Sequence, residues 1–422
     1  MCEPAAASIR TRLQSLRRQS QTLVLSRPTT RRSELIQLVH VPVNPELLEW
    51  ACERAGYSVD SFAEKYPKVK LKEWIAEDTE PTLKQLEAFA KTIRASIGYF
   101  FLPEPPKETV PIPDFRTIAG RGIARPSPDL LDTIYICQQR QEWFRDYAKA
   151  VQEPTAEFVG STDRRRKPEA IATMIRDTLG FSIDERRRLR TWTDALRRFI
   201  EQAEDIGVLV MVTSVVGSNN KRKLNPDEFR GFALSDPIAP LIFINGSDTK
   251  SAQMFTLAHE LAHLWLGETA LSDATMRVEP NNNVEKWCNQ VAAELLVPLD
   301  AIVEHYRDTD DLMTEVNRLA RIFKVSTLVV LRRIYDAGRM PRNAFWAAYD
   351  EEVDRLRSIA ANKSGGGNFY HTTAARVGKR FARAIIGSAL EGRASFSDAL
   401  HLLGFKKMAT FKDLGRSVGL DI

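Results

Sequence analysis

Two histidines and a glutamate within five consecutive residues form the clearest chemical pattern of this chain. His259, Glu260 and His263 give H-E-x-x-H inside the apolar segment T-L-A-H-E-L-A-H-L-W-L-G, residues 256–267. At about 100° per residue, the two histidines project from one face of a helix, one turn apart, where both can bind one metal ion. Zn²⁺, one ion per chain, is the cofactor that this pattern favours, with a third protein ligand and a fourth position open to water.

Glu260 lies beside the expected ion and is the predicted general base. A bound Zn²⁺ lowers the pKa of a water molecule to about 7, and Glu260 can take a proton and pass it to a leaving amine. A chance occurrence of the pattern is the alternative. However, a segment that is apolar nearly all round is typical of a buried helix, and buried histidines and carboxylates are costly unless they are paired or bind metal. The pattern therefore predicts a catalytic metal site.

The third ligand is expected from the next predicted helix, residues 284–297, which offers Glu285 and Glu294. Asn289 follows Glu285 by about one turn on the same face, so it can orient a histidine while Glu285 binds metal. Glu294 lies about two and a half turns beyond Glu285 and could reach a different level of the site. We predict Glu285 as the ligand, with Asn289 and Glu294 behind it, and Glu294 stays the alternative ligand.

The motifs of these two helices resemble those of a known enzyme family. H-E-L-A-H followed by E-K-W-C-N-Q-V-A-A-E-L-L-V-P, residues 285–298, is similar to the ImmA/IrrE family of zinc metallo-endopeptidases. Members pair H-E-x-x-H with E-x-x-A-N-x-F-A-A-x-L-L-x-P. Cys288 stands where the family usually has Ala, and Val291 where it usually has Phe, which we interpret as tolerated packing changes. The resemblance extends from about residue 44 to the end, with its specific motifs between residues 229 and 298.

This resemblance implies a gluzincin-like core in which His259, His263 and Glu285 bind zinc and Glu260 is the base. Known members act on helix-turn-helix transcriptional repressors. The resemblance therefore implies a regulatory protease whose protein substrate is a repressor or antitoxin, encoded by a neighbouring gene.

Composition and charge exclude several other classes of protein. The chain has 422 residues, of which 43% are hydrophobic, so it should divide into two to four domains. No stretch is long and apolar enough to cross a bilayer, and four scattered cysteines give neither a disulfide framework nor a thiolate zinc site. A soluble cytoplasmic protein is expected. The net charge of +5 equals that of residues 1–40, which hold seven Arg and two Glu (7 − 2 = +5), so the rest is neutral and lacks a general polyanion-binding surface. We expect this leader to be a disordered arm or the result of a wrongly chosen start codon, rather than a transit peptide.

Residues 44–102 contain short amphipathic helices in quick succession, similar to a helix-turn-helix domain of the phage-repressor (XRE-like) type. The third helix would present Lys68, Lys70 and Lys72 to the major groove of DNA. Acidic residues outnumber basic ones in this segment, which argues against strong DNA binding. DNA binding and a docking or assembly role both stay open.

Three strands are expected before the metal helix, at residues 208–213, 229–234 and 241–245, because each is rich in β-branched or aromatic residues. Leu241–Ile244 is the candidate edge strand for pairing with an extended peptide, although a continuous apolar run is equally typical of a core strand.

The predicted fold class is α+β and mostly α. It combines a helical N-terminal bundle, a gluzincin-like zincin core with a small sheet, and a small helical C-terminal domain. The metal helices are expected at 251–266 and 284–297, with a helix-turn-helix-like extension at 313–338. The predicted domains are a disordered basic leader (1–43), a helix-turn-helix-like domain (44–102), a proline-rich linker (103–128), a zinc metallopeptidase domain (129–362) and a C-terminal domain (369–422).

The leading hypothesis is a zinc-dependent endopeptidase that cleaves a transcriptional repressor or antitoxin and so regulates transcription. A DNA-binding regulator with a structural or sensory zinc site is the main alternative, motivated by the N-terminal helical unit. A metallohydrolase for small substrates is a third hypothesis, which the apolar helix allows but no residue specifically supports.

Overall fold

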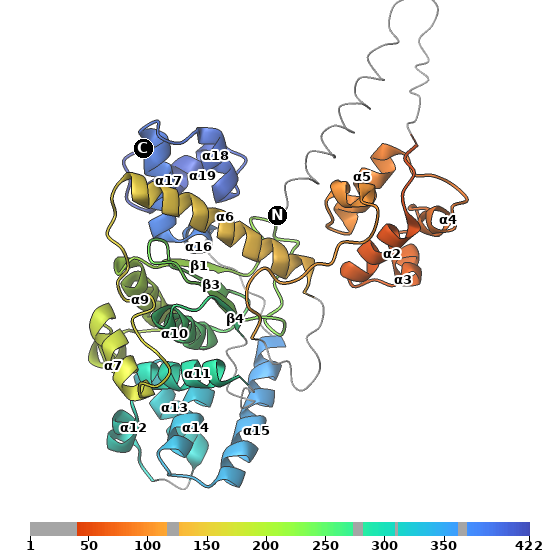
Figure 1. Cartoon of the computed structure of the whole chain (residues 1–422). Coiled ribbons are helices and arrows are strands. Elements are labelled where there is room, and N and C mark those ends of the chain that lie inside the picture. Colours follow the sequence, from red (N-terminus) through yellow and green to blue (C-terminus); the bar gives the residue numbers. More distant parts are fainter. Residues whose placement is uncertain (1–39, 116–125, 273–281, 309–310, 362–368) are drawn as a thin grey trace, which may run out of the picture. The chain divides into compact units, whose positions relative to one another are not determined.

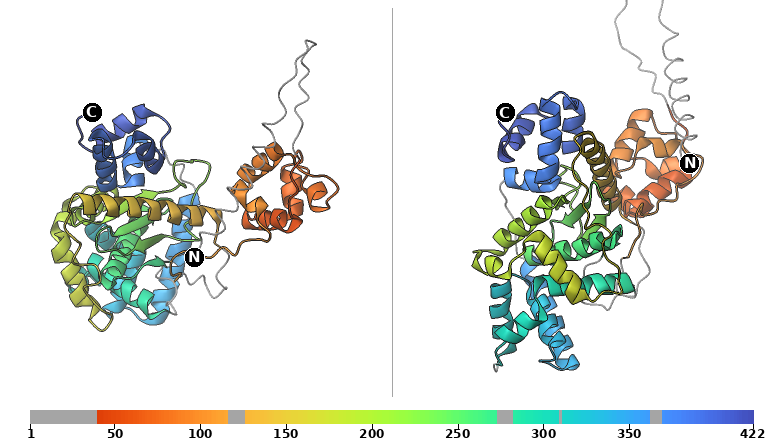
Figure 2. Two further views of the ribbon diagram at one scale, coloured as in Figure 1. Left: turned by 45° about the horizontal axis from the view of Figure 1, so that its top comes forward. Right: turned by 60° about the vertical axis from the view of Figure 1, so that its left-hand side comes forward.

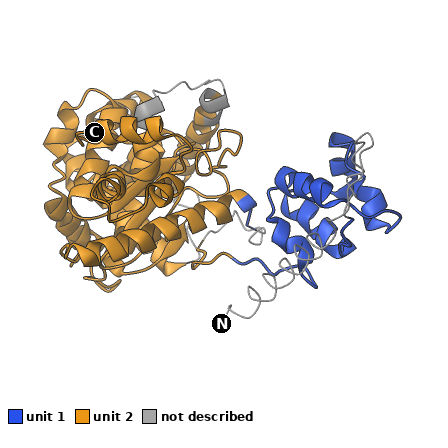
Figure 3. Cartoon of the chain, turned by 90° about the horizontal axis from the view of Figure 1, so that it is seen from above, with its two compact units in different colours: residues 1–109, 125–128 blue, residues 110–124, 129–422 orange. Residues whose placement is uncertain are grey.

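The structure is a computed structural model that describes residues 40–115, 126–272, 282–308, 311–361 and 369–422. The chain divides into two compact units, residues 1–109 with 125–128 and residues 110–124 with 129–422 (Figure 3). Residues 1–39, which make up most of the predicted leader, lie outside the described residues.

Unit 1 is a bundle of short helices around an aromatic core. Phe62, Phe89 and Phe100 are almost fully buried at its centre. The helix starts are set by local sequence: the side chain of Thr82 and that of Gln85 form a reciprocal capping box at the last α-helix of the bundle. The helices are α2 (Pro45–Arg54), α3 (Val59–Lys65), α4 (Leu71–Ile75) and α5 (Leu83–Thr92), followed by the 3₁₀-helix η1 (Ile97–Phe101).

Unit 2 is built on one small mixed sheet with helices on both faces. The strands are β1 (Leu209–Thr213), β2 (Gly231–Leu234), β3 (Leu241–Asn245) and β4 (Ala270–Ser272), in the order β1-β3-β2-β4. β1 and β3 are parallel, whereas β2 is antiparallel to both β3 and β4. This mostly helical α+β architecture confirms the predicted fold class.

Successive side chains of each strand point to opposite faces of the sheet and enter two separate cores. On β3, Ile242 and Ile244 belong to one hydrophobic core, and Leu241 and Phe243 belong to the other. Figure 1 shows α6 and α10 on opposite sides of the strands. The first core packs against α7 (Pro168–Leu179), α9 (Trp192–Asp205), α10 (Lys250–Leu266) and α11 (Asn283–Leu296), and continues into α8 (Ile183–Arg188), α12 (Leu299–His305), α13 (Leu312–Phe323), α14 (Thr327–Asp336) and α15 (Arg342–Ala361).

The opposite face of the sheet is covered by the long helix α6 and by the C-terminal helices. Phe381 and Phe411 of the C-terminal region share the second core with Leu209 and Phe243 of the sheet. The C-terminal helices stay next to α6 in both further views (Figure 2). Residues 369–422, predicted as a separate small domain, therefore share a core with the sheet. These helices are α6 (Pro128–Ala150), α16 (Phe369–Val377), α17 (Lys379–Leu390), α18 (Phe396–Leu403) and α19 (Met408–Ser417).

The sheet has a different edge from the one expected from the sequence. β3 pairs with β1 on one side and β2 on the other, so the prediction that Leu241–Ile244 forms an edge strand is wrong. Its continuous apolar run reflects burial on both faces. β4 is an edge strand of the sheet, and the sequence analysis missed it because three residues carry no detectable periodicity.

None of the helices within the described ranges combines the length and the hydropathy that crossing a lipid bilayer requires.

Candidate metal centre

The helix α10 carries the H-E-x-x-H residues, and its ends are fixed by local sequence. Thr249 caps its first turn, accepting a hydrogen bond from the backbone N–H of Ala252 at 3.2 Å. Gly267 ends the helix with a φ of 74°, a left-handed conformation that suits glycine. The helix agrees with the predicted segment 251–266 to within one residue at its start.

The second helix, α11, begins one residue before the predicted 284–297. The side chain of Asn282 accepts a hydrogen bond from the backbone N–H of Val284 at 2.8 Å, so Glu285 lies in the first turn. α10 and α11 pack against each other within the same core, which places the start of α11 beside the middle of α10.

Three side chains from these helices converge in a buried group. The Nε2 atoms of His259 and His263 lie 3.1 Å apart. One Glu285 oxygen is 3.2 Å from His259 Nε2 and the other is 3.0 Å from His263 Nε2. The two histidines are 0% exposed and Glu285 is 1% exposed. One ligand atom from each residue lies within 4.8 Å of the others.

This group fits a metal ion by its donor set and by its spacing. Two ligands at zinc-bond distance in a tetrahedral site are about 3.3 Å apart, close to the separations seen here. The Nε2 atoms of the two histidines face each other and the Glu285 carboxylate, so these three groups are the ones placed to share an ion. His259, His263 and Glu285 can therefore hold a metal ion.

The charges in the group favour an ionised carboxylate. Burial would raise the pKa of Glu285, but His259 and His263 outweigh it and lower the pKa to about 2. Burial would lower the pKa of His259, whereas the charge of Glu285 and the hydrogen bond that His259 donates to it raise the pKa above its usual value. Burial dominates at His263 and lowers its pKa. An ionised carboxylate and a neutral imidazole are the forms that bind metal.

Glu260 follows the first ligand and is completely buried. Burial raises the pKa of its carboxyl group to about 8, although the charge of His259 acts to lower it. Neither carboxylate oxygen makes a hydrogen bond of ordinary geometry with the described residues, although the Ser272 hydroxyl is near enough to act against the rise in the pKa of Glu260. A buried carboxyl group with unused oxygens and a pKa near neutrality suits proton transfer to and from a small molecule.

Close packing between α10 and β2 brings Glu260 against the sheet. A Cβ atom at Gly231 would lie 2.6 Å from Thr256 Cγ2, 2.8 Å from the backbone oxygen of Phe243 and 3.2 Å from Glu260 Oε1. Only glycine at position 231 therefore allows α10 to lie this close to β2. The sequence analysis placed residue 231 in a strand but gave no reason for this glycine.

Two further side chains beside the group were missed from the sequence. Ser272 of β4 is buried, and its Oγ lies 3.3 Å from His263 Nε2. The ring of Phe115 lies 6.2 Å from that of His263, centroid to centroid. Neither residue has a spacing relative to the motif that could have indicated its place, because both approach through tertiary structure.

Asn289 and Glu294, the two residues predicted to lie behind the ligands, have different positions in the structure. Asn289 lies beside His259 and contributes to raising its pKa. Glu294 is not part of the group. Its carboxylate forms a buried ion pair with Arg333 and accepts hydrogen bonds at 3.3 Å from the backbone N–H of Leu299. Glu294 therefore has a structural role between α11, α12 and α14, and neither a ligand position nor a place behind the ligands.

The three lysines proposed for DNA binding lie at the start of α4. Lys70 pairs with Glu73 at 2.7 Å, and the Nζ of Lys72 lies 2.6 Å from Asp60. Lys68 is exposed. Two of the three charges are thus offset by neighbouring carboxylates.

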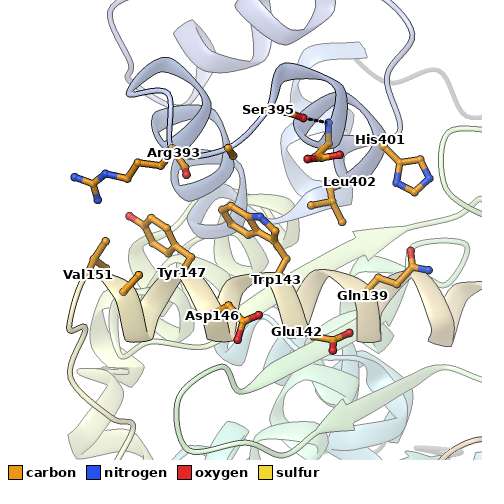
Figure 4. Close-up of a pocket in the computed structure, with 14 residues that line it drawn as sticks. Gln139, Glu142, Trp143, Asp146, Tyr147, Val151, Arg393, Ser395, His401 and Leu402 are labelled. Carbon is orange, nitrogen blue, oxygen red and sulfur yellow. Dashed lines mark hydrogen bonds between the residues drawn. The ribbon is translucent and has the colours of Figure 1, made fainter.

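A cavity of about 620 Å³ lies between α6 and the α17–α18 region (Figure 4). Figure 4 shows Trp143 and Tyr147 of α6 pointing toward the C-terminal helices, with their rings stacked at 5.5 Å. None of the predicted site residues lines this cavity. It belongs to the face of the sheet opposite the metal group.

Comparisons with known proteins match two parts of the chain. Residues 377–417 match a domain of unknown function (DUF8813). No curated protein matches the chain significantly. Residues 203–335, which include the whole sheet, α10 and α11, match the family Peptidase_M78, described as the IrrE N-terminal-like domain. That family indicates a metallopeptidase. Residues 203–335 are thus an IrrE N-terminal-like domain whose buried His259, His263 and Glu285 can bind a metal ion.

Proposed function

We propose that the protein is a zinc-dependent endopeptidase, with Zn²⁺ held by His259, His263 and Glu285 and with Glu260 as the general base. The observation that carries this proposal is the state of Glu260. This carboxyl group is completely buried and makes no hydrogen bond of ordinary geometry with the described residues, directly beside a group that can bind metal. A structural zinc site has no need of such a carboxyl group, because its ligands close the coordination shell.

Each residue of the group then has a defined part in peptide hydrolysis. Zn²⁺, when bound, supplies Lewis-acid chemistry: it lowers the pKa of a water molecule and polarises a carbonyl oxygen. Glu260, with a pKa raised to about 8 by burial, accepts the proton of the attacking water and donates it to the leaving amine. Asn289, beside His259, helps to hold that ring in the orientation that binds the ion.

The proposed substrate is a protein segment in extended conformation, because an edge strand of the sheet, β4, lies beside the metal group. Ser272 of that strand is 3.3 Å from His263, and extended peptides pair with such edges. The resemblance to the ImmA/IrrE family favours a helix-turn-helix repressor or an antitoxin encoded nearby. Three buried free cysteines, Cys52, Cys137 and Cys288, are compatible with a reducing cytoplasm.

The alternative of a DNA-binding regulator with a structural or sensory zinc site receives less support. Recognition of DNA relies on basic side chains that neutralise phosphates. Lys70 and Lys72 are already paired with Glu73 and Asp60. A salt-dependent shift of DNA by the purified protein would favour this alternative.

The experiment that tests the proposal replaces Glu260 by Gln and incubates the zinc-loaded protein with the product of the adjacent gene. Glu260→Gln is expected to keep one zinc per chain and to lose cleavage by about two orders of magnitude or more, because general-base catalysis contributes that much. Zinc content by atomic spectroscopy and product formation by mass spectrometry are the measurements. Equal cleavage by the variant and the parent protein would refute the mechanism.

A further inference from the structure

A short segment of the chain, residues 110–115, lies along the outer side of β4. The backbone N–H of Phe115 donates to the carbonyl oxygen of Leu271 at 2.9 Å, and the N–H of Leu271 donates to the carbonyl oxygen of Pro113 at 2.9 Å. Asp114 and Leu271 are bridge partners in parallel orientation. The segment therefore extends the sheet beyond β4, although the sequence analysis assigned it to a linker.

The side chains of this segment are held on both faces of the sheet. Phe115 is partly buried and packs against the core that contains α10, with its ring 6.2 Å from that of His263. Ile112 is 7% exposed and belongs to the core on the opposite face. An extended segment that contributes to both cores is part of the fold of unit 2, and unit 2 includes it from Val110 onward.

The edge that this segment covers is the one beside the metal group. A free edge strand presents backbone N–H and C=O groups that an extended peptide can pair with. At β4, both backbone groups of Leu271 are used by Pro113 and Phe115. The next residue, Ser272, touches His263. The other edge strand is β1, which two strands separate from β4 and which packs against α16.

We propose that residues 113–115 occupy, within the same chain, the edge of β4 at which a substrate peptide pairs, so that the peptidase is closed until this segment leaves. The proposal rests on the proposed function, since it concerns the same site. Phe115 takes the place of a substrate side chain beside His263. The substrate residue that replaces it is therefore large and apolar.

The amino-acid composition of residues 110–115 favours a segment that a substrate peptide can displace from the edge of β4. Pro111 and Pro113 have no backbone N–H, so they cannot donate to the sheet. Backbone hydrogen bonds at Pro113 and Phe115 hold the segment to β4, and a substrate strand with an N–H group at the position of Pro113 can form a further one. An incoming peptide with a complete set of N–H groups therefore competes with the segment.

The decisive experiment measures peptide binding by zinc-loaded full-length protein that carries Glu260→Gln, so that a bound peptide is not cut. The probe is a fluorescent peptide with the sequence of residues 110–115, Val-Pro-Ile-Pro-Asp-Phe. Phe115→Pro removes both the ring and the N–H donor, and Phe115→Ala removes the ring alone. Phe405→Ala removes a partly buried ring of the other core and is the matched control.

Phe115→Pro is expected to bind the peptide at least tenfold more tightly than the parent, with Phe115→Ala in between and Phe405→Ala unchanged. Hydrogen exchange at the Leu271 amide should be at least tenfold faster in Phe115→Pro. Equal peptide affinity in the parent, Phe115→Ala and Phe115→Pro would overturn the proposal. The Leu271 amide of the parent protein gives a further test that needs no variant, because rapid exchange there would also overturn it.

Hydrolysis of unfolded casein, measured with Glu260 intact, separates this inference from the proposed function. A rise of at least tenfold in Phe115→Pro over the parent supports both. Tighter peptide binding without hydrolysis by any variant keeps the occlusion and refutes the peptidase. Hydrolysis at the same rate in the parent and Phe115→Pro refutes the occlusion and keeps the peptidase.

Discussion

Glu260 and Glu285 show how position decides the behaviour of a buried carboxyl group. Both lie in the same group, yet burial raises the pKa of Glu260 to about 8, whereas His259 and His263 outweigh burial and lower the pKa of Glu285 to about 2. A carboxyl group held ionised suits a ligand, and one that titrates near neutrality suits proton transfer. Glu285 is the carboxyl group that contacts both imidazoles, and this contact accounts for the difference between the two residues.

The choice between Glu285 and Glu294 as ligand can be tested directly. Glu285→Ala is expected to lose stoichiometric zinc, because it removes one of three ligands. Glu294→Gln is expected to keep zinc but to lower the free energy of unfolding by about 2 kcal/mol, since the buried Arg333 keeps only Asp336 as an anionic partner. Zinc content and urea unfolding of both variants check this, and zinc loss in Glu294→Gln alone would reverse the assignment.

Gly231 gives a second prediction at the residue scale. An added methyl group would lie 2.6 Å from Thr256 Cγ2 and 2.8 Å from the Phe243 carbonyl oxygen, so Gly231→Ala should destabilise the protein by about 1–3 kcal/mol. Gly387, in the middle of α17, has open space at its Cβ position, and Gly387→Ala should stabilise the protein by about 0.5–1 kcal/mol. Thermal unfolding measures both, and a neutral Gly231→Ala would contradict the close approach.

At the scale of elements, the sheet and the two metal helices together position the side chains of the metal group. β2 meets α10 at Gly231, β4 brings Ser272 to His263, and α11 brings Glu285 to both histidines. The residues that can bind a metal ion therefore come from rigid elements, which hold a metal site more accurately than loops do.

A buried carboxylate links α9 to the C-terminal helices. Gly378 precedes α17 and offers no side-chain cap, and the Oε1 of Glu204 accepts a hydrogen bond from the N–H of Arg380 at 3.2 Å instead. Burial raises the pKa of Glu204 to about 7, although hydrogen bonds from the backbone of Arg380 and Lys379 act to lower it. The position at a helix N-terminus explains why a carboxyl group is tolerated there.

The raised pKa of Glu204 predicts a pH dependence. Between about pH 4.5 and 7 the folded protein keeps a proton that the unfolded chain releases, so the stability contribution falls as the pH rises through this window, by about 3 kcal/mol. Glu204→Gln should remove this loss and keep the acceptor for Arg380. Urea unfolding at pH 5 and pH 8 tests this prediction. The free energy of unfolding of the variant, relative to that of the parent, should be higher at pH 8 than at pH 5. The same difference between the two proteins at both pH values would contradict the prediction.

At the scale of the whole molecule, the chain consists of two units with separate cores. The segment that covers β4 follows directly on unit 1, which ends at Thr109 and takes up the chain again at residues 125–128. The segment that covers the edge therefore belongs to unit 2, as do the residues of the candidate metal group.

Removal of the metal should affect the thermal unfolding of the two units differently. The three candidate metal-binding residues all belong to unit 2. An ion that binds only the folded state adds about 2.7 kcal/mol of stability at a hundred times its dissociation constant. A strong chelator is expected to lower the unfolding temperature of unit 2 and to leave the transition of unit 1 unchanged. Differential scanning calorimetry with and without the chelator measures this, and a joint shift of both transitions would show that the units do not unfold independently.

The sequence by itself determined the local parts of this protein. Both metal helices, three of the four strands and the pair His259 and His263 follow from periodicity, capping residues and the i, i+4 spacing, which are properties of neighbouring residues. Glu285 was predicted because Asn289 follows it by one helical turn and can orient a histidine, and the family resemblance supports the same choice. The sequence could not exclude Glu294 as the ligand, because the spacing of residues within one helix does not determine which of its faces packs against another helix.

Only the tertiary structure decided which distant segments meet. The order β1-β3-β2-β4 made β3 central, the pairing of Glu294 with Arg333 removed it from the metal group, and hydrogen bonds to Leu271 turned part of a linker into an edge of the sheet. These contacts join residues far apart in the chain, and their free energy depends on the packing of the whole core. Residue spacing reports on contacts within an element, whereas contacts between elements exist only once the core has formed.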